Sequence, residues 1–280
     1  MKISVASGKG GTGKTTVSVN LAACLKEESI LMDVDVEEPN CHLFLPELEY
    51  TEETRYVPVP LIDENKCTHC GKCAEICQFN ALACLPDKVL IFTELCHSCG
   101  GCKLFCPYDA IKEVDTDIGV LKKACYNNLK FIYGVLKIGY PMAPPLIKMV
   151  KKYIEPDKIN ILDCPPGTSC PMVEAVKDTD YCILVSDPTP FGMHDVKLAM
   201  KTVKQLGIPY GIVINRADLG TDSLENYCRK ENIDILARIP NDRKIAETYS
   251  RGKLIVEELP EYKDIFINLF KNIQNKVSAN

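Results

Sequence analysis

The sequence of 280 residues contains no tryptophan, only four histidines, and no apolar run long enough to span a bilayer. Basic residues do not predominate either. The 33 lysines and arginines are outnumbered by 38 acidic residues, which argues against general affinity for nucleic-acid phosphates. The first seven residues run directly into a glycine-rich loop, which is not the layout of a signal peptide. These absences predict a cytoplasmic protein with neither a nucleic-acid partner nor a membrane role.

Cysteine is the residue in excess, with 16 copies. Nine of them lie between residues 62 and 115. In a reducing compartment, cysteines at such tight spacing indicate metal ligation rather than disulfides. We therefore expect a small metal-binding module in this segment.

On either side of that segment, short apolar runs alternate with helical patterns. Strands are expected at 2–7, 30–34, 130–135, 159–164, 181–186, 211–215 and 233–239, with helices near 15–26 and 194–206. Apolar runs without alternation are typical of strands buried on both faces of a parallel sheet. The pattern predicts an α/β domain with a doubly wound, mostly parallel sheet, formed by residues 1–61 and 116–280. The segment 62–115 interrupts it as an inserted domain, with Pro58-Val59-Pro60 as a stiff entry.

A phosphate-binding motif occupies the N-terminal loop. Gly8 to Thr15 fits G-x-x-x-x-G-K-S/T, between an expected strand and an expected helix. Its backbone amides can surround phosphate oxygens, while Lys14 reaches the β- and γ-phosphates and the Thr15 hydroxyl binds Mg²⁺. ATP and Mg²⁺ are thus expected ligands. The candidate nucleotide-binding residues here are Gly8, Lys9, Gly10, Gly11, Thr12, Gly13, Lys14, Thr15 and Thr16.

A second lysine in this motif, Lys9, narrows the range of P-loop families that the sequence resembles. K-G-G-x-G-K-T-T, from Lys9 to Thr16, resembles the deviant Walker A motif of the MinD/ParA/nitrogenase-iron-protein group of P-loop ATPases. This resemblance implies a homodimer with the nucleotide sandwiched between subunits. It also implies that Lys9 contacts the partner's nucleotide, as an arginine finger does.

Three further segments extend the resemblance. Leu31 to Asp35 resembles the first switch, which implies that Asp35 orients the attacking water and Asp33 lies near the magnesium. Ile161 to Thr168 resembles the Walker B strand and second switch, which implies magnesium binding by Asp163 and γ-phosphate sensing by the Gly167 amide. Val213 to Arg216 resembles the strand end at which Asn215 contacts adenine.

The cysteines of the insert form two copies of one unit. Cys67, Cys70, Cys73 and Cys77 recur 29 positions later as Cys96, Cys99, Cys102 and Cys106. This is the spacing of a bacterial two-cluster ferredoxin, in which the fourth cysteine ligates the other cluster. We therefore assign Cys67, Cys70, Cys73 and Cys106 to one [4Fe–4S] cluster, and Cys96, Cys99, Cys102 and Cys77 to a second. Zinc is the weaker alternative, because its sites usually use two separate C-x-x-C pairs. The insert is thus expected to be an α+β bacterial-ferredoxin-like domain.

Two other features have competing interpretations. Cys164 and Cys170 flank the second switch. They could hold a metal between two subunits, but we favour the interpretation that both pack as small buried apolar side chains. The apolar positions from Ile265 to Val277 have helical spacing. They fit a last helix docked on the sheet better than a membrane-targeting helix, because their polar neighbours are of mixed charge.

Taken together, the chain resembles MinD-superfamily ATPases that contain an inserted ferredoxin domain. Because the insert follows the first switch in the chain, we expect a dimeric ATP-hydrolysing switch that controls the exchange of electrons or iron–sulfur units with a partner protein. One alternative is an ATP-dependent reductase similar to the nitrogenase iron protein. A second is an iron–sulfur carrier or scaffold of the Mrp type, which the lack of a C-terminal C-x-x-C disfavours. A third is a MinD-like positioning ATPase with purely structural clusters.

Overall fold

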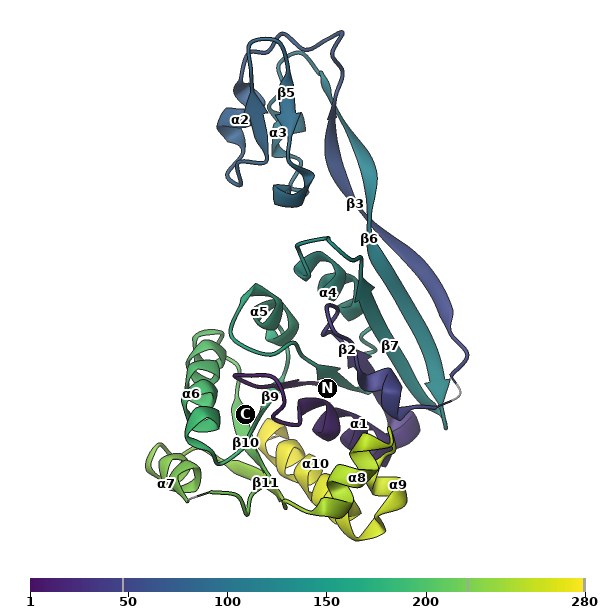
Figure 1. Cartoon of the computed structure of the whole chain (residues 1–280), viewed down its shortest axis with the longest axis vertical. Coiled ribbons are helices and arrows are strands. Elements are labelled where there is room, and N and C mark those ends of the chain that lie inside the picture. The colour runs from purple at the N-terminus through teal and green to yellow at the C-terminus, as the bar shows by residue number, and fades with distance from the viewer. Residues whose placement is uncertain (47, 221, 279–280) are drawn as a thin grey trace.

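The computed structural model describes residues 1–46, 48–220 and 222–278. Its centre is a nine-stranded sheet with the order β11-β10-β9-β1-β8-β2-β7-β6-β3 (Figure 1). The strands from β11 to β7 pair in parallel, while β6 pairs antiparallel with β7 and with β3. The sheet strands are β1 (Lys2–Ala6), β2 (Ser29–Asp33), β3 (Thr51–Ile62), β6 (Ile111–Tyr126), β7 (Leu129–Leu136), β8 (Ile159–Asp163), β9 (Tyr181–Ser186), β10 (Tyr210–Asn215) and β11 (Ile235–Ile239).

Helices cover both faces of the sheet. Successive side chains along a strand point to opposite faces, and each face forms an apolar core with the helices that cover it. Ile30 and Met32 enter the first core, and Leu31 enters the second. The first core is closed by α4 (Pro144–Lys151), α5 (Cys170–Val176), α6 (Pro190–Gln205) and α7 (Ser223–Lys230). The second is closed by α1 (Lys14–Leu25), α8 (Arg243–Ser250), α9 (Ile255–Glu258) and α10 (Lys263–Ser278). The α/β class and the mostly parallel sheet are therefore confirmed.

The C-terminal helix α10 packs on the second core through Phe266, Leu269 and Ile273, each no more than 1% exposed. Its apolar stripe therefore docks on the body of the protein, as the sequence predicts. Among the described residues, no helix combines the length and the apolar character that crossing a bilayer requires.

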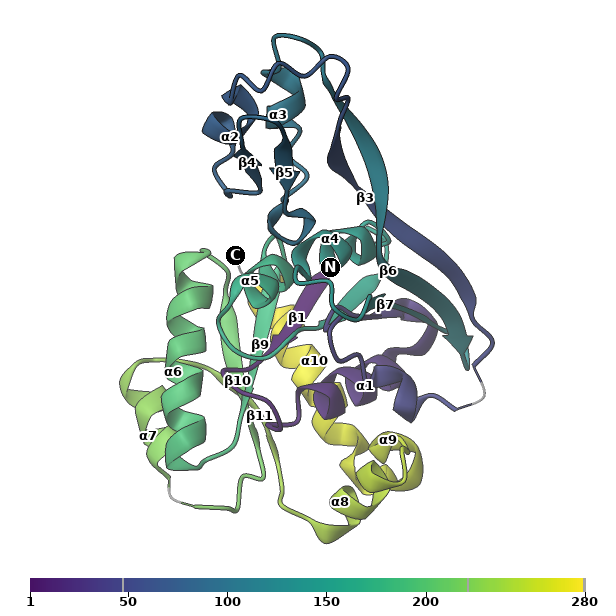
Figure 2. The same ribbon diagram turned by 45° about the horizontal axis from the view of Figure 1, so that its top comes forward.

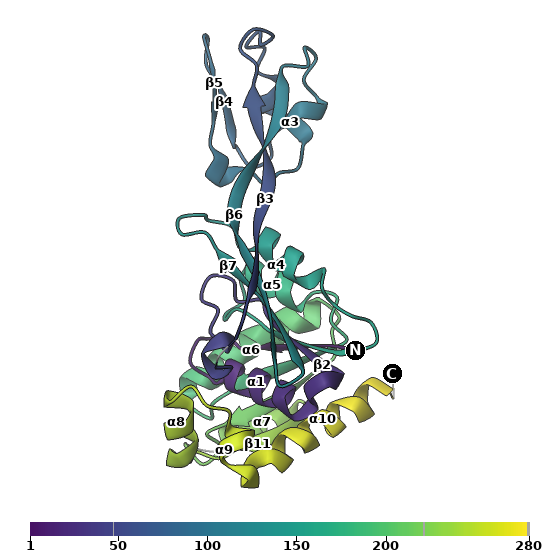
Figure 3. The same cartoon turned by 90° about the vertical axis from the view of Figure 1, so that its right-hand side faces the viewer.

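The antiparallel pair β3 and β6 extends beyond the other strands of the sheet as a long ribbon, and it carries the cysteine-rich segment. Strands β3 and β6 pair from Thr51–Lys123 to Ile62–Ile111, and the segment lies at their far end (Figures 1 and 3). The segment Pro58-Val59-Pro60, which the sequence predicts as a stiff entry to the insert, is part of this ribbon. Both prolines lie within β3, the edge strand of the sheet, which is where a strand tolerates the loss of a backbone amide. The predicted domain boundaries thus fall at the end of β3 and inside β6.

The segment at the tip of the ribbon folds around a small core of its own, which includes Val59, Leu82, Val89 and Ile111. It contains α2 (Lys72–Ile76), β4 (Leu82–Cys84), β5 (Val89–Ile91) and α3 (Gly101–Leu104) (Figure 2). The two sequence copies repeat in the backbone. Three pairs of residues 29 positions apart have positive φ: His69 and Ser98, Gly71 and Gly100, Asn80 and Asp109.

Candidate functional site

The phosphate loop leaves the N-terminus of α1 available to an anion. The helix begins at Lys14, has no side-chain cap and has no acidic residue in its first turn. The first amides of a helix lack intrahelical partners and carry partial positive charge, so this end favours phosphate oxygens. Lys14 is nearly buried beside them, and the buried Thr12 hydroxyl has no hydrogen-bond partner within the described chain. These features fit a phosphate group in the loop.

Asn215 contacts the loop from the end of strand β10, two strands away from β1 in the sheet. Its Nδ2 donates a hydrogen bond of 2.8 Å to the carbonyl oxygen of Thr12. The contact requires glycine at position 13, because a Cβ there would lie 2.2 Å from Asn215 Nδ2 and because φ of Gly13 is 96°. The predicted adenine residue is thus in direct contact with the phosphate loop.

An open cavity extends from the loop toward α8. It is lined by Gly11, Gly13, Thr16, Asn215, Arg216, Pro240, Asn241, Asp242, Ile245, Ala246 and Tyr249. Its mixture of apolar side chains, amides and one aromatic ring fits a nucleoside next to the phosphate site. The sequence identified Asn215 here but missed Tyr249 and the 240–246 segment, which reach the cavity only through the tertiary fold.

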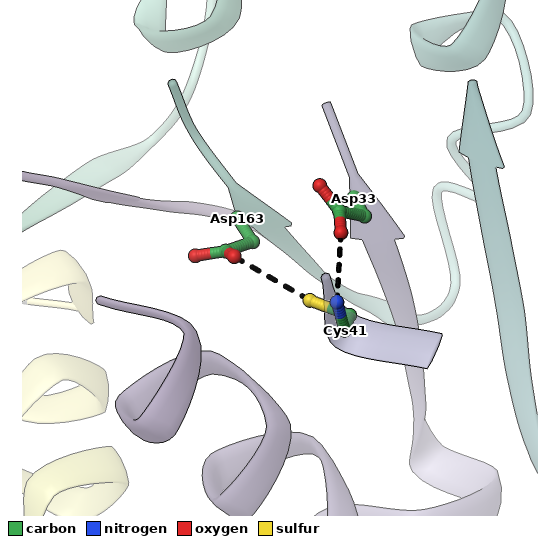
Figure 4. Close-up of side chains that lie close together, drawn as sticks. All are labelled: Asp33, Cys41 and Asp163. Atoms are coloured by element: carbon green, nitrogen blue, oxygen red, sulfur yellow. Dashed lines mark hydrogen bonds between the residues drawn. The ribbon is translucent and has the colours of Figure 1, made fainter. Parts of the chain in front are cut away.

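Two aspartates at the ends of neighbouring strands, Asp33 of β2 and Asp163 of β8, lie close together with Cys41 (Figure 4). Asp163 Oδ2 lies 2.7 Å from Thr15 Oγ1, and Asp163 Oδ1 accepts a bond of 2.8 Å from Ser18 Oγ. Asp33 Oδ2 accepts from the backbone amides of Asn40 and Cys41, at 2.9 and 3.0 Å. The Cys41 thiol donates to Asp163 Oδ2 at 3.4 Å. The strand ends and the loop that follows β2 therefore converge on the Thr15 hydroxyl.

This cluster suits a divalent cation. One potential ligand atom from each of Asp33, Cys41 and Asp163 lies within 4.8 Å of the others, and all three residues are buried. Burial raises the pKa of Asp33, and the neighbouring Asp163 raises it further. Burial also raises the pKa of Asp163, although hydrogen bonds and Lys14 oppose this. A cation such as Mg²⁺, which prefers oxygen ligands, would offset the repulsion between the carboxylates.

Both predicted switches touch this site. The Asp35 amide donates to Asp33 Oδ1 at 3.1 Å, and burial raises the pKa of Asp35 to about 6. The Gly167 amide donates to the carbonyl of Ser7 at 3.0 Å, which places the second switch beside the phosphate loop. The two segments therefore lie beside the phosphate loop and the aspartate pair, and their contacts with a γ-phosphate stay predictions.

Lys9 lies at the edge of the site. Its Nζ is 3.6 Å from Asp187 Oδ2, and the Asp187 side chain is nearly buried and accepts a hydrogen bond from Thr189 Oγ1. The Lys9 side chain itself is 31% exposed, so its contact with a second subunit stays a prediction.

The cysteines of the insert line two separate cavities. One cavity is lined by Cys67, Cys70, Cys73 and Cys106, and the other by Cys77, Cys96, Cys99 and Cys102. Each cavity thus takes three cysteines from one copy of the repeat and the fourth from the other copy. The crossing cysteines are equivalent in detail, since Ala81 donates its amide to Cys77 Sγ and Ala110 donates to Cys106 Sγ, both at 3.3 Å. These two donor sets fit cubane clusters with crossed fourth ligands.

The thiols of these cavities are shielded from water to different degrees. Burial raises the pKa of Cys73 and Cys96, and it raises the pKa of Cys102 to about 11. Free thiols in this environment hold their protons, and ligation of a metal displaces them.

Several residues beside Thr15 and Asp163 were not identified from the sequence. Asn40 Oδ1 lies 2.7 Å from Thr15 Oγ1, and Ser18 and Cys41 contact Asp163. Ser18 could have been found, because it lies one helical turn after Lys14 on the same face of α1. Asn40 and Cys41 lie at the start of a short 3-10 helix (Cys41–Phe44), where no periodic pattern marks a side chain's direction.

The two cysteines beside the second switch differ. Cys164 is completely buried in the first core, as the packing interpretation predicts. Cys170 is exposed at the first residue of α5, so the packing interpretation is wrong for it. The cause is local, since α5 begins on the solvent side of the switch segment and buries Met172, Ala175 and Val176 instead.

Comparisons with known proteins agree with this geometry. Residues 3–255 match the family model described as the CobQ/CobB/MinD/ParA nucleotide binding domain. The uncharacterized protein MJ0579 of Methanocaldococcus jannaschii is 33% identical, over 95% of this chain and 93% of its own. An iron-sulfur cluster carrier protein of Pyrococcus horikoshii is 25% identical, over 99% of this chain and 86% of its own.

Among solved structures, the septum site-determining protein MinD of Pyrococcus horikoshii, complexed with Mg-ADP, is similar in fold. Its TM-score is 0.62 at 21% identity, and the alignment covers 97% of this chain and 95% of that chain. The match supports the fold, and the family model covers most of the chain. The chain therefore belongs to the CobQ/CobB/MinD/ParA family of nucleotide-binding proteins.

Proposed function

We propose that this protein is a Mg²⁺–ATP-hydrolysing switch that carries two [4Fe–4S] clusters and couples its nucleotide state to electron transfer with a partner protein. In this proposal, residues 1–61 and 116–280 form the ATPase domain and residues 62–115 form the ferredoxin-like domain. The observation that carries it is the presence, on one chain, of an uncapped phosphate loop and two cavities with four cysteines each.

In the ATPase domain, the proposed roles follow from the contacts at the phosphate loop. Lys14 binds the β- and γ-phosphates, while Thr15, Asp33 and Asp163 hold Mg²⁺ directly or through water. Asp35 orients the attacking water. The MinD/ParA family consists of ATPases that work as nucleotide-dependent dimers, and this supports a homodimer in which Lys9 reaches the partner's nucleotide.

In the ferredoxin-like domain, the two cysteine sets hold the clusters, which when bound supply one-electron transfer. The domain accepts one electron from a reduced carrier protein and passes it to an oxidised protein partner. Gln78 follows the crossing ligand Cys77, whereas Pro107 follows the crossing ligand Cys106. The two sites therefore differ in the backbone next to their crossing ligands, which is a source of unequal cluster potentials.

The ribbon provides a physical basis for coupling the two domains. Strand β6 of the ribbon pairs with β7, and the Leu136 amide at the end of β7 donates to the carbonyl of Val36 at 2.8 Å. Val36 directly follows Asp35 in the first switch. A movement of this switch on ATP hydrolysis therefore acts on the base of the ribbon.

A second candidate function is iron–sulfur delivery, which is favoured by the relatives named iron-sulfur cluster carrier protein. The two functions differ in whether iron leaves the protein. Incubation of the iron-loaded protein with an apo-acceptor would release iron in the carrier, but not in the electron-transfer protein.

The main proposal is tested by following reoxidation of the reduced protein by a one-electron acceptor protein, with and without ATP. We expect ATP to change the rate, and the Lys14→Ala variant to lose this response while it keeps its iron. A rate that is indifferent to ATP in the intact protein would contradict the coupling.

A further inference from the structure

The two cysteine cavities of the insert differ in charge. The first cavity has Cys106 as its crossing cysteine, and the second cavity has Cys77. Among the described residues that line the first cavity, Lys72 is the only lysine, arginine, aspartate or glutamate; among those that line the second, Glu113 is the only one. One histidine lines each cavity, so histidine does not distinguish them. A cation therefore faces one site and an anion faces the other.

These charges lie at positions where the two copies of the repeat differ. Lys72 occupies the position that Gly101 occupies in the second copy, 29 residues later. Glu113 occupies the position that Cys84 occupies in the first copy. Neither charge therefore has a counterpart at the other site, although the four ligand positions are equivalent in both copies.

Glu113 lies against the loop that carries ligands of the second cavity. It belongs to β6 and is paired with Pro60 of β3. Its Oε1 would lie 3.4 Å from a Cβ at Gly100, the residue that follows Cys99. Its Oε2 accepts a hydrogen bond of 3.0 Å from Lys103 Nζ. Lys103 is not among the residues that line the cavity, and its side chain is 49% exposed against 27% for Glu113. The anion is therefore closer to the cavity than the cation that opposes its charge.

A charge beside an iron–sulfur cluster shifts its reduction potential, because reduction adds one negative charge to the cluster. A nearby anion disfavours reduction, and a nearby cation favours it. We propose that Glu113 lowers the potential of the second cluster and Lys72 raises that of the first, so that an electron held by the insert rests mainly on the first cluster. This inference rests on the proposed function, because it requires both clusters to be bound.

This order of potentials has a direction along the ribbon. The first cavity is lined by Ile62 and Ile111, which pair with each other at the far end of the ribbon. The second cavity is lined by Pro58 and Pro60, which lie nearer the sheet. The electron comes from the reduced carrier protein and leaves to the oxidised partner, and no covalent bond forms or breaks. It therefore rests at the end of the insert that is remote from the ATP site.

The experiment is an anaerobic redox titration followed by EPR, on the full-length protein with its iron content measured. Cys99→Ser identifies the signal of the second cluster, and we expect the first cluster to have the higher potential in the parent. Glu113→Gln should raise the reduced-to-oxidised ratio of the second cluster about tenfold at a fixed potential, which is about 59 mV for a one-electron couple. Lys72→Gln should lower the ratio of the first cluster by a smaller factor, because Lys72 is exposed and water screens its charge.

Two further variants separate the effect of charge from that of structure. Lys103→Gln breaks the same ion pair as Glu113→Gln but removes the opposite charge, so it should lower the reduced-to-oxidised ratio of the second cluster. If the pair served only to hold the fold, both variants would shift the potential in the same direction. Asp87→Asn removes an exposed carboxylate that lines neither cavity, and we expect it to leave both potentials unchanged.

Three results would overturn the inference. The first is a parent protein in which the first cluster does not have the higher potential. The second is an unchanged potential of the second cluster in Glu113→Gln, and the third is a shift of the same sign in Glu113→Gln and Lys103→Gln. Each leaves the proposed function intact if ATP still alters the rate of reoxidation in the parent. A parent protein that assembles no clusters would instead remove the proposed function and this inference together.

Discussion

Replacement of Asp35 by asparagine separates the energetic cost of the first switch from its catalytic role. Burial is the main cause of the raised pKa of Asp35; Lys14 opposes it, and the neighbouring Asp163 and Glu37 add to it. We expect Asp35→Asn to bind ATP, because the phosphate loop is unchanged. We also expect it to lose about 10²- to 10⁴-fold in hydrolysis, the usual contribution of a group that activates water.

The same variant should be more stable than the parent when Mg²⁺ and nucleotide are removed. The pKa of Asp35 rises from its ordinary value of 3.8 to about 6, and one pKa unit corresponds to about 1.4 kcal/mol. The ionised carboxylate therefore opposes folding by at most about 3 kcal/mol near neutral pH. The folded protein favours the protonated acid. Protonated Asp35 therefore stabilises the fold fully below pH 3.8, and this stabilisation is lost as the pH rises through about 6.

The assay is urea unfolding of both proteins in chelator, under anaerobic conditions, at about pH 5 and about pH 7.5. Between these two pH values, the parent should lose more of its free energy of unfolding than the variant does. The extra loss should be roughly half of the maximum cost of the ionised carboxylate. Addition of Mg²⁺ and ATP should then stabilise both proteins, because both bind the nucleotide. Parallel pH profiles for the two proteins would refute the reasoning, since the buried carboxylate would then carry no cost.

Two further predictions concern the metal sites and the dimer. Cys106→Ser should perturb the EPR signal of the cluster bound by Cys67, Cys70 and Cys73, whereas Cys99→Ser should perturb the other signal; a shared target for both variants would contradict the crossed ligation. Lys9→Ala should retain ATP affinity but fail to form an ATP-dependent dimer in size-exclusion chromatography and fail to hydrolyse ATP, because its partner-directed cation is lost. Dimer formation and hydrolysis at the parent's level would show that Lys9 acts only within its own subunit.

Much of the ATPase domain was predictable, because its strands are buried on both faces. Such strands appear as short apolar runs, and the runs at 30–34 and 181–186 lie within a residue of β2 and β9. The phosphate loop was equally clear, since its glycines and Lys14 are adjacent in sequence.

The ribbon was not predictable from the same signals. Strand β3 carries Pro58 and Pro60 and exposes half of its side chains, so it lacks both the apolar run and the composition of a buried strand. Its pairing with β6 is a tertiary contact across the whole insert. The contacts of Asn40 and Cys41 were hidden for a related reason, because they depend on how the segment after β2 folds back onto Asp33.

The central claim is that one chain combines a Mg²⁺–ATP site with two four-iron clusters. Its most direct test is to count iron and sulfide and to measure bound nucleotide in the same anaerobically purified sample, with EPR before and after ATP. We predict about eight irons per chain, stoichiometric Mg²⁺–ATP binding, and an EPR change with ATP that Lys14→Ala abolishes. A protein that binds ATP but contains no iron, or that holds iron and ignores ATP, would contradict the account.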